Sequence, residues 1–146
     1  MYFLGKRSTD NLKGVHPDLV KVVQRAISIT KQDFAVIEGL RSKERQEQLV
    51  KEGKSQTTNS RHLTGHAVDI VPWVDGKPSW DWKFYSEVRS AMIQAAGELG
   101  VEIEWGGNWK TFKDGPHWQL PWSKYPVAGI QTSGYQSPEH WRAVVL

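Results

Sequence analysis

Two short segments of the chain carry side chains that could hold a metal ion and activate water. Residues 60–69 contain His62 and Asp69, and residues 114–117 begin with Asp114 and end with His117. Two imidazoles and one carboxylate are a ligand set that suits Zn²⁺ and leaves a fourth coordination position open for water. Asp114 lies three residues before His117, where its carboxylate could accept a proton from that water. These residue types indicate metal-assisted hydrolysis.

Asp69 is favoured over His66 as the middle ligand. Asp69 lies within an apolar strand pattern, where a carboxylate costs free energy unless it is paired, hydrogen-bonded or bound to a metal. His66 is the rival, because it lies four residues after His62, the spacing of a helical zinc pair. Gly65 and the β-branched residues that follow it argue against a helix there. The three favoured ligands lie on separate segments, so they meet only if the fold brings them together.

The segments around these residues predict an α+β domain. A helix is expected from Pro17, with a buried stripe between Leu19 and Ile27, and further helices over residues 43–51 and 81–99. Short apolar runs predict strands at residues 34–38, 67–71, 101–105 and 117–120. Residues 1–15 are expected to form an irregular arm and residues 53–61 a polar loop. The lack of strict β-α-β alternation favours α+β over α/β.

Composition limits the class of protein. A length of 146 residues predicts one domain, and the absence of cysteine excludes disulfides and thiolate zinc sites. No apolar run is long enough for a membrane anchor or a secretory signal, which needs about 7–15 apolar residues. The net charge of +3 suits attraction to a polyanion or is an ordinary solubility charge. Without a basic stripe it disfavours nucleic acid. A monomer is the default expectation.

Eight tryptophans are a high number for this length. Several of them lie in Gly/Pro-rich stretches near the two segments described above, where loops would line a cleft. Their amphipathic rings suit contacts with sugars or peptides. Packing in the core is the alternative for each of them.

The motifs resemble those of a known family. Ser60-x-His62-x-x-Gly65-x-Ala67-x-Asp69 resembles the zinc motif of the D-alanyl-D-alanine peptidases, which include vancomycin-resistance carboxypeptidases and dipeptidases. Asp114-x-x-His117-Trp118 resembles the second motif of that family. Residues 16–19, 38–42 and 105–107 further resemble the bacteriophage L-alanyl-D-glutamate peptidases, a group of endolysins. This resemblance covers roughly residues 12–122.

The resemblance implies a small antiparallel sheet with flanking helices and a zinc site like that of hedgehog proteins and D-Ala-D-Ala peptidases. It also implies roles for individual residues. His62, Asp69 and His117 would hold Zn²⁺, and Asp114 would act as the base that passes a proton to the leaving amine. Arg41 would polarise the scissile carbonyl. Ser60 would either bind substrate or fix its own loop. Many relatives carry Glu at the position of Asp114, whereas phage members carry Asp.

The function implied is zinc-dependent hydrolysis of the L-alanyl–D-glutamate bond in peptidoglycan stem peptides, as a phage endolysin in host cell lysis. Residues 1–122 would form the catalytic domain and residues 123–146 an extension packed on it. Without a signal peptide, the protein would stay in the host cytoplasm until a separate holin-type pore released it to the cell wall. One alternative is a D-alanyl-D-alanine carboxypeptidase or dipeptidase with the same zinc centre. Another is a non-catalytic wall-binding module, against which Asp114 argues.

Overall fold

An antiparallel sheet forms the centre of the molecule in a computed structural model that describes residues 1–55, 60–109 and 113–126. Its main path runs in the order β1-β2-β5-β4, and β3 pairs with the far end of β2. The strands are β1 (Phe34–Glu38), β2 (Ala67–Val74), β3 (Lys77–Pro78), β4 (Glu104–Trp105) and β5 (His117–Gln119). All the strand pairs are antiparallel, which confirms the expected fold class.

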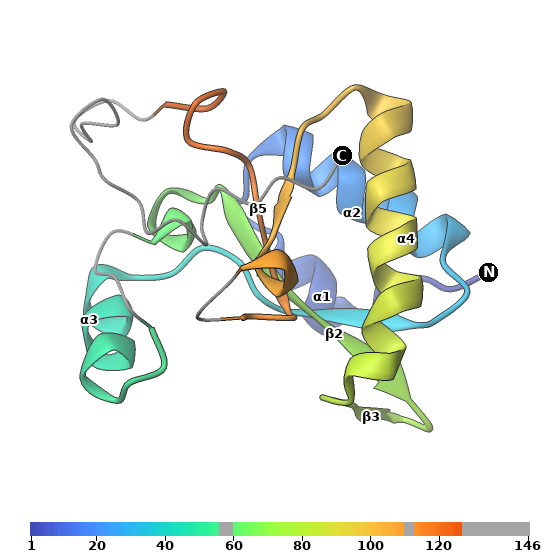
Figure 1. Cartoon of the computed structure of the whole chain (residues 1–146), viewed down its shortest axis with the longest axis horizontal. Helices are drawn as coiled ribbons and strands as arrows, with labels where there is room; N and C mark the ends of the chain where they lie inside the picture. Colours follow the sequence, from blue (N-terminus) through green and yellow to red (C-terminus); the bar gives the residue numbers. More distant parts are fainter. Residues whose placement is uncertain (56–59, 110–112, 127–146) are drawn as a thin grey trace.

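Helices flank the sheet at different places (Figure 1). They are α1 (Lys6–Asn11), α2 (Pro17–Ile29), α3 (Lys43–Lys51) and α4 (Trp82–Leu99), with 3-10 turns η1 (Arg61–Thr64) and η2 (Gly106–Asn108). Helices α2 and α4 pack against each other, and α3 lies apart from them, on the other side of β2 and β5. The main apolar core combines the inner faces of α2 and α4 with strand residues such as Val36 and Ile70.

The long helices begin and end where the sequence predicts. Pro17 opens α2, and the His16 imidazole accepts a hydrogen bond from the Asp18 amide. The Ser42 hydroxyl caps α3 in the same way, and Gly100 ends α4 in a left-handed conformation with φ of 68°. The buried stripe of α2 contains each of the residues expected in it, from Leu19 to Ile27. Local signals were sufficient here because they coincide with the apolar pattern.

Two expectations about the N-terminal half are wrong. The predicted irregular arm contains α1, which packs on β1; the buried Ser8 hydroxyl accepts a hydrogen bond from the Val36 amide. A short polar helix of this kind is stabilised by tertiary contact, so the sequence pattern does not show it. The predicted polar loop ends in η1, and its last residue, Arg61, is only 1% exposed.

Two strands of the second half and the exposure of one helix residue also need correction. Strand β2 extends to Val74 and forms a hairpin with β3, where only a turn was expected. Residues 101–103 lie outside β4, which is shorter than predicted because it pairs only with the short β5. The helical spacing of apolar residues predicts that Leu99 lies on the buried face of α4, but it is 43% exposed because the helix ends there.

The start of the C-terminal extension packs on the domain. The Tyr125 hydroxyl donates to Asp18 Oδ2 at 2.8 Å, and its carbonyl oxygen accepts from Arg61 Nη2 at 2.8 Å. The run Ser137-Pro138-Glu139 predicts the start of a short helix, but it lies outside the described residues. Among the helices of residues 1–126 that are described, none has both the length and the apolar character needed to cross a bilayer.

Candidate metal centre

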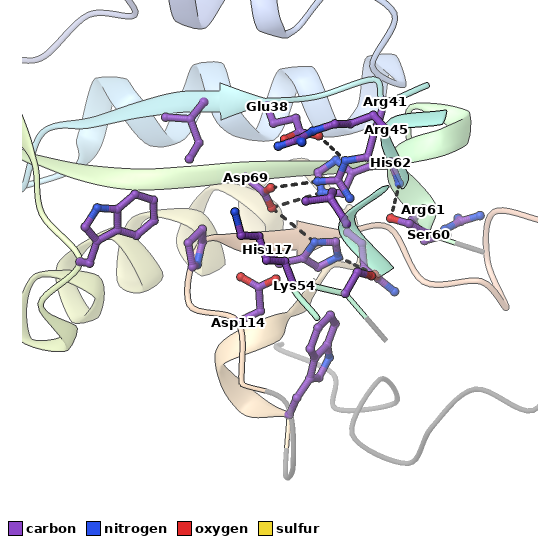
Figure 2. A pocket seen from close by; sticks show the side chains of 17 residues that line it. Glu38, Arg41, Arg45, Lys54, Ser60, Arg61, His62, Asp69, Asp114 and His117 are labelled. Atoms are coloured by element: carbon purple, nitrogen blue, oxygen red, sulfur yellow. Dashed lines mark hydrogen bonds and ion pairs between the residues drawn. The ribbon is translucent and has the colours of Figure 1, made fainter. Parts of the chain in front are cut away.

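Three ligand-type side chains converge from separate elements (Figure 2). His62 comes from η1, Asp69 from β2 and His117 from β5, and the β2–β5 register places Asp69 directly opposite His117. Asp69 Oδ1 lies 3.2 Å from His62 Nε2 and 3.5 Å from His117 Nδ1. The three ligand atoms all lie within 4.8 Å of one another, close enough to bind one metal ion. We refer to these residues as the His–Asp–His group.

A glycine with positive φ allows η1 to turn directly into β2. Gly65 has φ of 76°, and a Cβ at this position would lie 2.2 Å from the Gly14 carbonyl oxygen. Any other residue would therefore clash as well as adopt an unfavourable backbone conformation. The turn brings His62 back over the strand that carries Asp69.

Hydrogen bonds outside the group leave the correct nitrogen of each imidazole free for a metal. His62 Nδ1 lies 2.8 Å from the Gly39 carbonyl oxygen, which can only accept, so Nδ1 carries the hydrogen and Nε2 faces Asp69. His117 Nε2 lies 2.7 Å from Gln119 Oε1, and the amide of Gln119 donates in turn to Glu104 Oε2 at 3.1 Å. His117 Nδ1 is thereby left free. Such outer contacts are typical of imidazoles that bind metals, and the donor set fits zinc.

His66, the rival ligand, lies outside the group. Its Nδ1 is 2.7 Å from the Thr64 hydroxyl, and its ring lies 5.3 Å from that of His16. Burial lowers the pKa of His66 to about 4, with further contributions from Arg61 and His16. This imidazole is therefore neutral and packed beside α2 instead of facing the other ligands.

The two acidic residues at the centre have opposite electrostatic environments. Burial alone would raise the pKa of Asp69, but the imidazoles of His62 and His117 outweigh it and hold the pKa far below its usual range. Burial and the charge of Asp69 raise the pKa of Asp114. No hydrogen bond or ion pair to the Asp114 carboxylate occurs within the described residues, and the side chain lines the same pocket. It is an available proton acceptor next to the ligands.

Comparison with known proteins gives the family. Residues 1–119 match the family described as phage L-alanyl-D-glutamate peptidase. The chain belongs to this family. The L-alanyl-D-glutamate peptidase of Escherichia phage T5 is 34% identical to this peptidase over 114 residues, which are 75% of this chain and 83% of that protein. A peptidoglycan L-alanyl-D-glutamate endopeptidase of Bacillus subtilis, CwlK, is 32% identical over 103 residues, 60% of each chain.

A solved structure extends the similarity to the fold. The Serratia marcescens L-Ala D-Glu endopeptidase ChiX superposes with a TM-score of 0.81 and is 51% identical. The match covers 86% of this peptidase and 95% of ChiX. The similarity therefore extends over the fold of most of the chain.

The group lies in a pocket of about 360 Å³, which is lined by residues of β1, α3, η1, β2 and β5. Trp80, which is 59% exposed, and Trp109 line it, as expected for cleft tryptophans. Trp105 and Trp118 are buried and stack on each other in the core, with ring centroids 5.6 Å apart. Some tryptophans therefore line the cleft and others pack in the core.

Arg41 lies at the junction of β1 and α3 and reaches the group. Its backbone amide donates to the His62 carbonyl oxygen at 2.9 Å. Its guanidinium forms an ion pair with Glu38, donates to Gln46 Oε1 at 2.7 Å, and lies 3.3 Å from Asp69 Oδ2. These contacts orient Asp69, and the planar guanidinium keeps further N–H donors.

Ser60 lines the pocket and also caps η1. Its hydroxyl oxygen accepts a hydrogen bond from the His62 amide at 3.1 Å, which fixes the segment that carries the ligand. The hydroxyl hydrogen is still able to donate to a bound molecule. The geometry thus gives Ser60 the loop-fixing role, and its contact with substrate stays a prediction.

Sequence reasoning missed the residues behind the ligands. Gln119 follows His117 by two positions in a strand, so both side chains lie on one face of the sheet, and this alternation could have identified it. Glu104 is opposite Gln119 in the β4–β5 register, which the sequence does not show. Burial raises the pKa of Glu104 to about 7 despite its hydrogen bond from Gln119.

Arg61 was also missed, because its segment reads as a polar loop. Its guanidinium donates to the carbonyl oxygens of Leu120 at 3.1 Å and Tyr125 at 2.8 Å, and lies 4.3 Å from the Trp122 ring centroid. Burial lowers the pKa of Arg61 to about 10, so it remains charged at neutral pH. It attaches the segment after β5 to the wall of the pocket.

Proposed function

We propose that this peptidase hydrolyses the L-alanyl–D-glutamate bond of peptidoglycan stem peptides with zinc held by His62, Asp69 and His117. The family, the relatives named for this bond and the geometry of the His–Asp–His group support the proposal. Zinc, when bound, would lower the pKa of a water molecule toward about 7 and polarise the scissile carbonyl.

The side chains of the peptidase supply the proton transfers and the charge stabilisation. The Asp114 carboxylate accepts a proton from the attacking water and delivers it to the nitrogen of the leaving D-glutamate. Burial and the charge of Asp69 raise the pKa of Asp114, which favours acceptance of the proton. The remaining N–H donors of Arg41 stabilise the negative charge that develops on the carbonyl oxygen, and the Ser60 hydroxyl donates to the bound peptide.

One observation carries the choice of an enzyme over a wall-binding module. Asp114 is a partly buried carboxylate that forms no hydrogen bond or ion pair with another described residue and lies beside the His–Asp–His group. A structural metal site would not need it, and an unpaired buried carboxylate costs folding free energy. Its presence is accounted for by proton transfer in catalysis.

We extend the proposal to the wider role of the protein. Residues 1–122 form the catalytic domain of a monomeric phage endolysin, with residues 123–146 as an extension. The protein accumulates in the host cytoplasm and reaches the cell wall through a separate holin-type pore. Its partner is the peptidoglycan stem peptide.

Mass spectrometry of fragments released from purified peptidoglycan, with and without a zinc chelator, tests the proposal. We expect chelator-sensitive release of peptides that begin with D-glutamate, leaving L-alanine on the muramic acid. Loss of only terminal D-alanine would instead assign a carboxypeptidase. Binding to the wall without any cleavage would assign a wall-binding module.

A further inference from the structure

Some of the cationic side chains that line the pocket are paired within the fold, and others are not. Arg41 is paired with Glu38 and Asp69, and Arg61 is turned toward backbone carbonyls. Among the residues that the structure describes, the two other cations that line the pocket are Arg45 and Lys54. Arg45 forms no ion pair within the described part of the chain. Lys54 has one exposed partner, Glu52 at 3.3 Å, and its side chain is 67% exposed.

Both cations are held on the pocket side of α3. Arg45 and Leu49 lie four residues apart on one face of the helix, and both line the pocket. After α3, Gly53 adopts φ of 73° and the chain folds back, so that the Lys54 amide donates to the Leu49 carbonyl oxygen at 2.9 Å. This turn directs the chain back, so that Lys54 lines the same pocket as Arg45.

A side-chain bridge fixes the turn against the metal centre. Gln46 accepts a hydrogen bond from Arg41 through Oε1 and donates through Nε2 to the Ser55 hydroxyl at 2.9 Å. Since Arg41 also contacts Asp69, the residue after Lys54 is linked to the His–Asp–His group through two side chains. The two cations and the centre therefore lie around one pocket, as Figure 2 shows.

The substrate of the proposed function has a matching charge. In an L-alanyl–D-glutamyl peptide, the amine of D-glutamate belongs to the scissile bond and one of its carboxyl groups continues the peptide. Its other carboxyl group is free, as a carboxylate or, in amidated wall peptides, as a neutral carboxamide. This group lies within one residue of the bond that must reach the metal centre.

We propose that Arg45 and Lys54 form a subsite for the free carboxylate of the D-glutamyl residue, on the leaving-amine side of the scissile bond. The inference rests on the proposed function and adds a specificity to it: peptides with a free carboxylate are preferred over amidated ones. It also orients the substrate. The D-glutamyl side lies toward α3, and the L-alanyl side points away from it.

The test compares two soluble stem peptides that differ only in a carboxylate or a carboxamide at this position. The full-length, zinc-loaded protein is assayed for kcat/KM on each peptide, and the ratio is compared between variants, because the ratio does not depend on the fraction of folded protein. The variants are R45Q, K54Q and the double variant. K51Q is the matched control, since Lys51 is an exposed cation of α3 that does not line the pocket.

We expect the wild type to prefer the carboxylate peptide by about tenfold, the size of one or two partly exposed charge-assisted contacts. The preference should fall to between about one and twofold in the double variant, persist in K51Q, and shrink at high ionic strength. Equal cleavage of the two peptides by the wild type, or a double variant that keeps the tenfold preference, would overturn the subsite alone. An equal loss in K51Q would also overturn it, by assigning the effect to overall charge. Cleavage of neither peptide at the Ala–Glu bond would overturn the proposed function itself.

Discussion

Replacing Gln119 with leucine tests whether the residues behind the ligands tune the metal centre. Gln119 Oε1 is the acceptor that leaves Nδ1 of His117 free for a metal, and leucine removes it while filling a similar volume. Loss of such an outer contact typically weakens metal affinity by about 10–100-fold. This corresponds to about 1.4–2.7 kcal/mol of zinc-dependent stabilisation. For a domain of this size we expect the zinc-induced rise in melting temperature to shrink by about 3–10 °C.

The assay measures melting temperature with excess zinc and with chelator for the wild type, Q119L and the control Q94L. Gln94 is an exposed residue of α4 whose amide bonds only Glu98, so its leucine variant should keep the full zinc-induced rise. Q119L also removes a donor from Glu104, which lowers the melting temperature without zinc; the difference between the two conditions excludes that effect. A zinc-induced rise in Q119L equal to that of the wild type would refute the reasoning.

Three further predictions concern the base, a buried acid and a turn. D114N should lower kcat by about 10²–10⁴-fold while the zinc content stays at the wild-type level, because the base is lost and the ligands are not; metal analysis beside kinetics checks this. The pKa of Glu104 is raised from 4.5 to about 7 in the folded protein, so the stability it contributes is full below about pH 4.5 and is lost as pH rises through 7. Between pH 5 and 8, the free energy of unfolding of the chelator-treated wild type should fall by up to about 3 kcal/mol more than that of E104Q, which lacks the titrating carboxyl group. Plots of unfolding free energy against pH that run parallel for the two proteins would contradict this. G65A should destabilise the fold by more than about 2 kcal/mol and lower zinc affinity, whereas G76A, with a similar φ of 78° but open space around it, should cost only about 1 kcal/mol in denaturant unfolding.

The elements that could be predicted are those whose signals are local. Helix α2 has a proline at its start, a side-chain cap and an apolar stripe of helical period, and these signals agree with one another. Strand β2 shows its β-branched pattern, and Gly65 marks the turn before it. Helix α1 lacks such a pattern, because it is held by contacts with β1 such as that of the Ser8 hydroxyl. A contact between residues so far apart in the chain leaves no local signal.

The residues of the candidate site likewise include some that have a local sequence signal and others that have none. His62 and Asp69 could be identified because they lie within one short motif, and His117 because it follows Asp114 closely. The structure places these side chains together, as the motifs suggested, although the resemblance was needed to join the two segments. The network from His117 through Gln119 to Glu104 depends on how β4 pairs with β5. Register between two short strands is set by the whole sheet, so it could not be predicted from either segment alone.

Arg41 shows how one residue can have both kinds of role. The resemblance implies contact with the scissile carbonyl, yet its guanidinium also connects Glu38, Gln46 and Asp69, which belong to β1, α3 and β2. A single ammonium group could not reach these three partners in different directions, so the planar guanidinium is required for the geometry as well as the charge. The same contacts extend through Gln46 to Ser55, beside Lys54. The orientation of Asp69 and the position of the proposed carboxylate subsite therefore depend on the same guanidinium.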